Sequence, residues 1–336
     1  MNSNISVLEY AQKLLTLDNI LILTHSHPDG DTAGTGIALH RALTALGKNA
    51  AVACTDELPE HIEFLYEYAY PEKCFFGTPF EGIFDAENVV SVDIASPFLV
   101  GSSLSQYVPK ICLALDHHDI NTLEVPWLFA EPESSSAGET LYYALRELEN
   151  ITGKKLIDEK TACALYCAIA SDSGNFKYTN TKERTMHAAG ELMGLGADNG
   201  EISRRLFDIR SLEAFRAEAL CTRNVKFFCG GKLAFSHVNN AMRQEEGLLE
   251  SDFETCVQLL RMIRGVEVAI FAKEKTGDDG VEKYRISMRS NTFADVAEMC
   301  AVFGGGGHKK AAGCTIEGTL EEVMEKTVAE FEKVQG

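Results

Sequence analysis

The chain has 336 residues, of which 45% are hydrophobic and 24% are charged, and its formal net charge is −19. This length favours two domains, each with a core of its own. A surface this acidic disfavours long DNA or RNA, because duplex binding depends on Lys and Arg side chains that neutralise phosphates. Small anions can still bind at a site where bound metal ions make the local charge of the protein positive.

The sequence gives no sign of a membrane or secreted protein. No apolar run approaches the roughly 18 residues of a membrane-spanning helix, and the N-terminus MNSNISVLEYAQKLL lacks the pattern of a secretory signal. The ten cysteines have no framework spacing, so we expect reduced side chains rather than disulfides or zinc ligands. Cys163 and Cys167 fit a buried helix face better than a metal site. We therefore expect a cytoplasmic protein without a membrane partner.

Short β-rich runs alternate with amphipathic helical stretches in the first part of the chain. This pattern predicts an α/β domain over residues 1–195, with a largely parallel sheet flanked by helices. The expected strands are residues 20–24, 50–54, 89–93 and 111–116, and the expected helices are 32–46, 139–148 and 158–170. Thr181 is the expected N-cap of a further helix.

The second part of the chain starts with a helical connector, expected over residues 196–224, and continues as a smaller α+β domain over 225–336. Gly230 and Gly231 separate two β-rich runs and predict a hairpin. The turn GDDG predicts a second hairpin, and Ser251 is the expected cap of a helix. Two final helices are expected over 294–302 and 320–334. We expect an active-site cleft between the two domains.

Acidic and imidazole side chains gather where the expected strands of the first domain end. They are His25, Asp29 and Asp31 after the first strand, Asp93, Asp116, His117 and His118 after two later strands, and Asp172 at the end of a helix. Carboxyl ends of parallel strands meet at one edge of a sheet, so these side chains can converge. Their oxygens and nitrogens suit hard divalent cations. The pattern therefore predicts a metal site.

Each of these segments alone has a simpler interpretation. An Asp at the end of a strand, such as Asp93, is more often a helix cap or a turn former, and the same holds for Asp172. The joint pattern is harder to explain in this way, because five of the nine histidines lie in three short motif segments: His25, His27, His117, His118 and His308. The role of His27 stays open, since its side chain can face away from the site.

The C-terminal stretch GGGGHKKAAG is weak evidence by itself, because consecutive glycines also form helix ends and flexible turns. Here it follows the strand-like RISMRS in a chain that is short of positive charge, and freed backbone N–H groups with nearby cations can bind phosphate. The expected substrate-binding residues are Arg289, Ser290, Gly305, Gly306, Gly307 and His308. The run Ser134 to Ser136 is a further candidate contact, although serines more often cap a helix.

Six segments resemble, in order and spacing, the motifs of one family. They are HSHPDGD, VDIAS, DHHDIN, SDSGNF, RISMRS and FGGGGHKKAAG. They resemble the DHH phosphoesterase superfamily, in particular its members with a DHH-associated C-terminal domain, the nanoRNase-type oligoribonucleases and phosphoadenosine-phosphate phosphatases. Thr35 stands where Ser is common and Ser171 where Thr is common, and neither change removes a metal-binding group.

The resemblance implies two divalent metal ions, with manganese as the expected metal. One ion would be held by His25, Asp29 and Asp93. The other would be held by Asp31, Asp93, His117 and Asp172. Asp93 would therefore bridge both ions.

The resemblance also implies roles for the residues around the ions. Asp93, Asp116 and His118 are the expected catalytic residues. Asp116 would orient the histidine pair, and His118 would contact the scissile phosphate or assist proton transfer. Arg289 and His308 would hold a terminal phosphate or the 3′-side nucleotide across the cleft.

The implied activity is hydrolysis of short RNA oligonucleotides, including dinucleotides, by a hydroxide that bridges the two metals. The compound 3′-phosphoadenosine 5′-phosphate is a second candidate substrate. An alternative is a phosphodiesterase of cyclic dinucleotides such as cyclic di-AMP, or of linear products such as pApA. A non-catalytic nucleotide sensor is the alternative from another class, although every expected ligand position is filled. The oligomeric state stays open, with a homodimer among the candidate assemblies.

Overall fold

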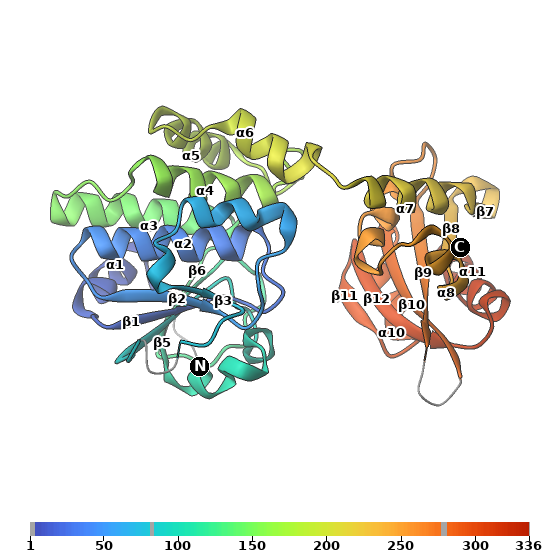
Figure 1. Cartoon of the computed structure of the whole chain (residues 1–336), viewed down its shortest axis with the longest axis horizontal. Coiled ribbons are helices and arrows are strands. Elements are labelled where there is room, and N and C mark those ends of the chain that lie inside the picture. The colour runs from blue at the N-terminus through green and yellow to red at the C-terminus, as the bar shows by residue number, and fades with distance from the viewer. Residues whose placement is uncertain (1–3, 81–83, 277–280, 336) are drawn as a thin grey trace. The chain divides into compact units, whose positions relative to one another are not determined.

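The computed structural model describes residues 4–80, 84–276 and 281–335 (Figure 1). The chain divides into two compact units, Met1–Ile209 and Arg210–Gly336. The stretch expected as a connector is shared between them, with α6 (Asn199–Ser203) in the first unit and α7 (Leu212–Arg223) in the second. Within the described ranges, no helix has both the length and the apolar character needed to cross a membrane.

The first unit is built on a parallel sheet of six strands in the order β3-β2-β1-β4-β5-β6. The strands are β1 (Ile20–Leu23), β2 (Ala50–Cys54), β3 (Cys74–Phe76), β4 (Asn88–Val92), β5 (Ile111–Asp116) and β6 (Trp127–Ala130). The four expected strands are confirmed to within one residue at either end. Strands β3 and β6 were not predicted, because they have only three and four residues and so carry little alternation.

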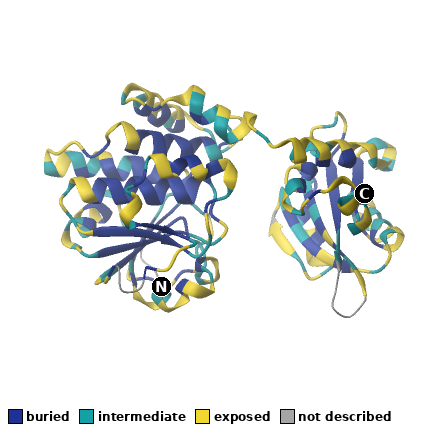
Figure 2. Cartoon of the chain, viewed as in Figure 1, coloured by how far each residue is buried: buried dark blue, intermediate teal, exposed yellow. Residues whose placement is uncertain are grey.

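Helices cover the first sheet. They are α1 (Val7–Thr16), α2 (Gly30–Ala45), α3 (Ala137–Thr152), α4 (Glu159–Asp172) and α5 (Glu183–Gly194). Helix α2 packs against α3 and α4 and is buried from Gly30 to Leu43, as the dark blue ribbon of Figure 2 shows. Cys163 and Cys167 lie on α4 and are buried, as predicted. The expected cap was wrong for α5, whose N-cap is Lys182 rather than Thr181.

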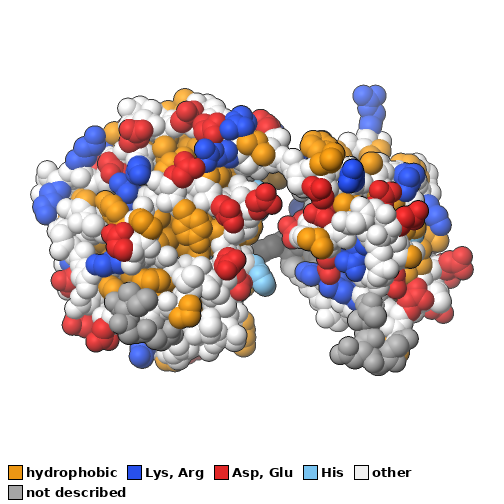
Figure 3. Space-filling view, in the orientation of Figure 1, with side chains coloured by type: hydrophobic (Ala, Val, Ile, Leu, Met, Phe, Trp, Pro, Cys, Tyr) orange, Lys and Arg blue, Asp and Glu red, His pale blue; other side chains and the backbone are white. Residues whose placement is uncertain are grey.

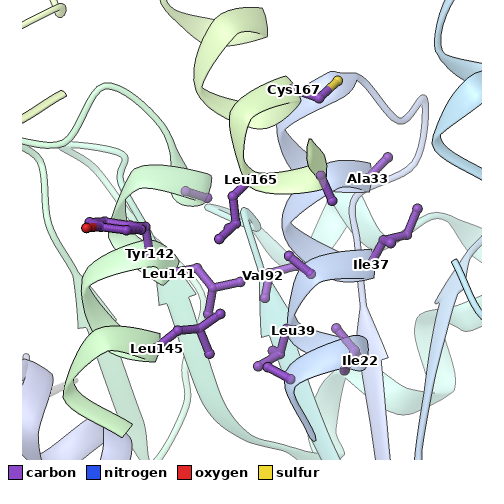
Figure 4. Packing of buried hydrophobic residues seen from close by; sticks show 14 of the residues in the cluster. Ile22, Ala33, Ile37, Leu39, Val92, Leu141, Tyr142, Leu145, Leu165 and Cys167 are labelled. Atoms are coloured by element: carbon purple, nitrogen blue, oxygen red, sulfur yellow. The ribbon is translucent and has the colours of Figure 1, made fainter. Parts of the chain in front are cut away.

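The core of the first unit lies between the sheet and these helices. In Figure 4, Ile22 of β1 and Val92 of β4 face Leu39 of α2 and Leu141 of α3, with Leu165 of α4 in the same cluster. All five side chains are fully buried. Removal of this much apolar surface from water is the main force that holds the sheet and the helices together.

The second unit contains a mixed sheet of six strands in the order β11-β12-β10-β9-β8-β7. The strands are β7 (Lys226–Phe228), β8 (Leu233–Val238), β9 (Val268–Thr276), β10 (Glu282–Ser290), β11 (Gly306–His308) and β12 (Ala311–Glu317). Only β8 and β9 pair in parallel; the other neighbours are antiparallel. One core contains residues of α10 (Val296–Ala301) and α11 (Leu320–Gln335), and another contains residues of α7 and α9 (Cys256–Arg261).

Most of the expected elements of the second unit are confirmed, with local corrections. Strands β7 and β8 form the first hairpin, but a 3-10 turn at Cys229–Gly231 and Lys232 separates them instead of a two-residue turn. The strands β9 and β10 form the second hairpin, and its turn lies outside the described residues. Ser251 starts a 3-10 turn, whereas α9 begins after Thr255, so the expected cap was wrong.

Candidate metal centre

The strand order of the first sheet creates a natural site at its carboxyl edge. The chain runs outward in one direction through β1, β2 and β3 and in the other through β4, β5 and β6, so the order reverses between β1 and β4. At such a switch point the loops that follow the two central strands diverge and leave a crevice, where ligands of open α/β sheets bind. His25 follows β1 and Asp93 follows β4, so both flank this point.

The predicted His and Asp side chains converge at this edge into three groups, each able to hold a metal ion. The groups are His25 with Asp29 and Asp93, Asp31 with His117 and Asp172, and Asp93 with His117 and His118, and the ligand atoms of each lie within 4.8 Å of one another. Asp93 joins the groups through both of its oxygens. Its Oδ2 lies 3.4 Å from Nε2 of His25, and its Oδ1 lies 3.6 Å from Nε2 of His117.

Asp93 has two features that are unusual for an aspartate. Its backbone has φ = 58°, a left-handed conformation that is costly for a residue with a side chain. The residue is 3% exposed, and the buried Oδ1 has no hydrogen-bond partner among the described residues. A buried carboxylate oxygen without a partner is costly unless it is paired with a cation or coordinates a metal. Strained backbone and an unpaired oxygen therefore fit a metal ion at this position.

Asp31 is fully buried and held by the N-terminus of another helix. Its Oδ2 accepts a hydrogen bond from the backbone N–H of Ala137 at 2.7 Å, and its Oδ1 accepts one from that of Gly138 at 2.9 Å. The hydroxyl of Thr35 donates a third at 3.1 Å. A Cβ atom at Gly138 would lie 2.4 Å from that of Ala168, so this close approach requires glycine. The first turn of α3 thus fixes the Asp31 carboxylate.

Asp29 is both a helix cap and a candidate metal ligand. It is the N-cap of α2, and its Oδ1 accepts hydrogen bonds from the backbone N–H groups of Asp31 and Thr32, each at 3.0 Å. The same Oδ1 lies 3.8 Å from Nε2 of His25, and the Asp29 side chain is 50% exposed. The cap orients the carboxylate and leaves half of it open toward solvent or a ligand.

The rings of His25 and His118 are each oriented by a contact of Nδ1. Nδ1 of His25 lies 2.8 Å from the carbonyl oxygen of Ser26, which favours a proton on Nδ1 and leaves the Nε2 lone pair for a metal. Nδ1 of His118 lies 2.8 Å from Oδ1 of Asp116. The backbone N–H of His117 donates to the same Asp116 oxygen at 2.8 Å. Asp116 thus contacts the ring of His118 but only the backbone of His117.

Asn121 also belongs to the site, although it was not among the residues predicted from the sequence. Its Nδ2 donates to Oδ2 of Asp116 at 2.6 Å and to the carbonyl oxygen of Ile94 at 3.0 Å. It therefore fixes the carboxylate that orients His118. The signal available in the sequence was its place in DHHDIN, five residues after Asp116, but an Asn in a loop is also an ordinary turn former.

The electrostatics of the cluster call for added positive charge. Burial and the neighbouring carboxylates raise the pKa of Asp31 and that of Asp172 well above the usual value. Burial opposes protonation of His25, but Asp93 and Asp29 outweigh it and raise the pKa of His25 to about 9. The hydrogen bond that the His118 ring donates to Asp116 is the main reason that the pKa of His118 rises to about 9. Divalent cations would relieve the repulsion among these carboxylates.

His27 lies apart from the three groups. Its side chain is 94% exposed, and its Nδ1 lies 3.1 Å from Oδ2 of Asp56. The serines of the run before α3 have helix-capping partners: Ser136 is the N-cap, and Ser135 donates to Glu139 at 2.8 Å. The capping interpretation therefore accounts for Ser135 and Ser136.

The second unit contains a pocket of about 600 Å³ beside the glycine-rich stretch, lined by Arg289, Gly305, Gly306 and Gly307 among others. Ser290 is fully buried next to it, is not part of the pocket lining, and donates a hydrogen bond to the carbonyl oxygen of Ala294 at 2.8 Å. The side chain of His308, the remaining expected contact, lies outside the described residues, although its backbone belongs to β11.

Comparisons with known proteins give both units a family. Residues 19–169 match the DHH family, N-terminal domain, and residues 231–335 match the DHHA1 domain. The chain is 29% identical over 311 residues to the bifunctional oligoribonuclease and PAP phosphatase NrnA of Thermus thermophilus, covering 92% of this chain and 88% of that protein. It is 24% identical over 310 residues to the protein of that name from Bacillus subtilis, covering 92% of each.

A solved structure supports the fold along almost the whole chain. The crystal structure of an exopolyphosphatase-related protein from Bacteroides fragilis matches with a TM-score of 0.85 and 20% identity, covering 97% of this chain and 96% of that one. The sequence motifs, the two domain matches and this likeness agree. The chain therefore belongs to the DHH family of metal-dependent phosphoesterases and carries a DHHA1 domain after its DHH domain.

Proposed function

We propose that this chain is a two-metal phosphodiesterase and phosphatase that hydrolyses short RNA oligonucleotides, with 3′-phosphoadenosine 5′-phosphate as a second candidate substrate. The observation that carries this proposal is the position of Asp93, whose two carboxylate oxygens each lie near a different histidine. A carboxylate between two such groups is the arrangement that a pair of neighbouring divalent ions requires.

The proposed ligands are those predicted from the sequence. His25, Asp29 and Asp93 hold one ion, and Asp31, Asp93, His117 and Asp172 hold the other, with Mn²⁺ as the proposed metal. When bound, two such ions lower the pKa of a water molecule and neutralise charge that develops on the phosphoryl oxygens. The residues of the chain hold this geometry: Asp31 through the first turn of α3, and Asp29 through its cap of α2.

His118 is the proposed proton-transfer residue, and Asp116 is its positioning residue. The Asp116 carboxylate holds Nδ1 of the His118 ring and leaves its Nε2 free to meet a substrate oxygen. The high pKa of His118, about 9 without metal, means that the ring can hold a proton at neutral pH and donate it to a leaving oxygen. Asn121 donates a hydrogen bond to Asp116 and so helps to fix the orientation of this pair.

The substrate class is motivated by the relatives and by charge. The two relatives with 29% and 24% identity are named as oligoribonucleases and PAP phosphatases. A net charge of −19 disfavours long polyanions and therefore favours small anionic substrates. We also propose a cytoplasmic location, which would suit the ten free cysteines.

A substrate panel tests the proposal. Purified protein with Mn²⁺ is incubated with RNA dinucleotides, an RNA 24-mer, 3′-phosphoadenosine 5′-phosphate, cyclic di-AMP and pApA, and products are separated by chromatography. We expect turnover of the dinucleotides to exceed that of the 24-mer. Preferential hydrolysis of cyclic di-AMP or pApA would redirect the proposal to that class, and hydrolysis of none would favour a nucleotide sensor.

Two variants identify the site responsible. Asp93→Asn removes the shared carboxylate and is expected to abolish every activity in the panel. Asp119→Asn makes the same chemical change at an exposed residue two positions after His117, outside the three groups, and should leave turnover unchanged. An activity that survives in Asp93→Asn would not come from this centre.

A further inference from the structure

The pocket of the second unit extends well beyond Arg289. Its lining continues along β10 to Ser287 and Arg285 and across to Gly313 and Thr315 of β12. The register pairs Arg289 with Ala311, Ser287 with Gly313 and Arg285 with Thr315, so these side chains share one face of the sheet. Small residues in the middle leave a trough with an arginine at each end.

The charged side chains among the described residues that line this trough are all positive. Two arginines and no carboxylate occur among the described residues that line it, in a chain whose net charge is −19. Figure 3 shows Lys and Arg side chains gathered on this part of the unit, where Figure 1 places β10 and β12. A positive trough in an acidic protein is expected to attract an anion selectively.

Arg285 differs from the cations around it. Lys273 and Lys275 on β9 share Glu250, at 3.7 and 2.8 Å, and Lys283 lies 3.1 Å from Glu317. Arg285 is exposed and forms no ion pair with any residue that the structure describes. Its guanidinium is therefore available to a ligand, and the exposed hydroxyl-bearing Thr315 lies directly across from it.

We propose that Arg285, with Ser287 and Thr315, forms a second phosphate subsite that recognises an additional phosphodiester group of an RNA oligonucleotide. Arg289 and the glycines Gly305 to Gly307 hold the first phosphate, as the proposed function states, and this inference rests on that proposal. The two arginines lie four positions apart on β10, about 13 Å between their backbones. The subsite makes the enzyme prefer oligonucleotides with two or more phosphates over substrates with one.

Binding without hydrolysis tests the subsite directly. In metal-free buffer with chelator, titration calorimetry compares ApA, which has one phosphate, with ApApA, which has two. We expect wild type to bind ApApA more tightly, and Arg285→Gln to lose about tenfold of affinity for ApApA with little change for ApA. Arg285→Lys should recover part of the loss. The slope of log Kd against log salt for ApApA should become shallower by about 0.7 in Arg285→Gln.

Lys283→Gln is the matched control. Lys283 lies on the same strand and face and carries the same charge, but it is paired with Glu317 and does not line the pocket. Its removal should change neither affinity nor the salt slope. An equal loss of affinity for ApA and ApApA in Arg285→Gln would assign Arg285 to the first phosphate and overturn the second subsite. The second subsite would also be overturned if Arg285→Gln lost no affinity for ApApA, or if wild type bound ApA and ApApA equally.

Hydrolysis with Mn²⁺ separates this inference from the proposed function. In wild type, KM should be lower for ApApA than for ApA, and Arg285→Gln should raise KM for ApApA about tenfold while kcat stays unchanged. If wild type hydrolyses neither compound but shows the length-dependent binding, the proposed function fails and the subsite stands. If hydrolysis occurs but the Arg285→Gln and Lys283→Gln proteins have the same KM, the subsite fails alone.

Discussion

The two candidate binding places differ in the charge of their side chains. Acidic side chains gather at the carboxyl edge of the first sheet, and basic side chains border the open trough of the second sheet. At the first, Asp29, Asp31, Asp93 and Asp172 crowd together with histidines, and two of these carboxylates are almost completely buried. At the second, arginines border a trough with no carboxylate among its described residues. In the proposed function, metal ions supply the positive charge at the first place, and arginine side chains supply it at the second.

Single substitutions should therefore have different effects at the two places. At the metal centre, backbone donors fix the carboxylates of Asp29 and Asp31, and Asp93 is the proposed shared ligand, so a single change should remove chemistry and spare binding in the trough. In the trough the cations lie on an extended strand and act separately, so a single change should weaken binding and spare turnover. The following predictions test that contrast, from the largest effect to the smallest.

The largest effect is expected for Asp93→Asn. Even changes to groups that only support a metal ligand cost about 10–100-fold in activity, so loss of a shared ligand should lower kcat by more than about a hundredfold. Steady-state kinetics with Mn²⁺ and calorimetry with ApA measure both quantities. A large loss of ApA affinity in metal-free buffer, where only the trough can act, would break the proposed division of labour.

Two neighbouring glycines test the packing of the trough wall. A Cβ atom at Gly305 would lie 2.3 Å from the carbonyl oxygen of Gly313 and 2.4 Å from Cβ of Cys314, whereas one at Gly306 meets nothing within 4 Å. We expect Gly305→Ala to lower the free energy of unfolding of the second unit by about 3 kcal/mol. Gly306→Ala should leave it unchanged, and thermal unfolding followed by circular dichroism would show this. Equal stability of the two variants would contradict the close approach.

A smaller effect is expected for Arg289→Gln. A hydrogen bond to a charged group contributes about 1.5–3 kcal/mol, so KM for 3′-phosphoadenosine 5′-phosphate should rise about thirtyfold with kcat nearly unchanged. Initial rates over a range of substrate concentrations separate the two parameters. A fall in kcat with unchanged KM would mean that Arg289 acts in the transition state, which would remove the contrast with the metal centre.

The smallest effect concerns a histidine away from both sites. His40 on α2 is 1% exposed, and burial lowers its pKa to about 4. The unfolded chain binds this proton near the ordinary pKa of about 6.5, so stability is lost as the pH falls from about 6.5 to about 4. At pH 5.5 the loss is about 1.4 kcal/mol.

His40→Gln should therefore show a flatter fall of the unfolding free energy across this pH range, measured by urea unfolding. His187→Gln, at a site with a 63% exposed side chain, serves as the control and should follow wild type. Parallel curves for wild type and His40→Gln would show that His40 does not contribute to the acid sensitivity of the first unit.

Much of the fold was predictable because its signals are local. β2 and β5 are apolar runs followed by turns, and their bounds were predicted correctly. β3 and β6 escaped notice because three or four residues show no period, and only pairing with β2 and β5 makes them strands. Thr181 and Ser251 were plausible caps by residue type, but the N-caps of the two helices are Lys182 and Thr255.

The members of the proposed metal centre could be named from the sequence by itself, because ligand chemistry depends on residue type and the carboxyl ends of parallel strands meet at one edge of a sheet. Only the tertiary structure decided how they are held. Asp31 receives N–H groups from residues more than 100 positions away, and Asp93 turns one oxygen toward His25 and the other toward His117. The trough beside Arg285 likewise depends on the register of β10 and β12, which no local pattern encodes.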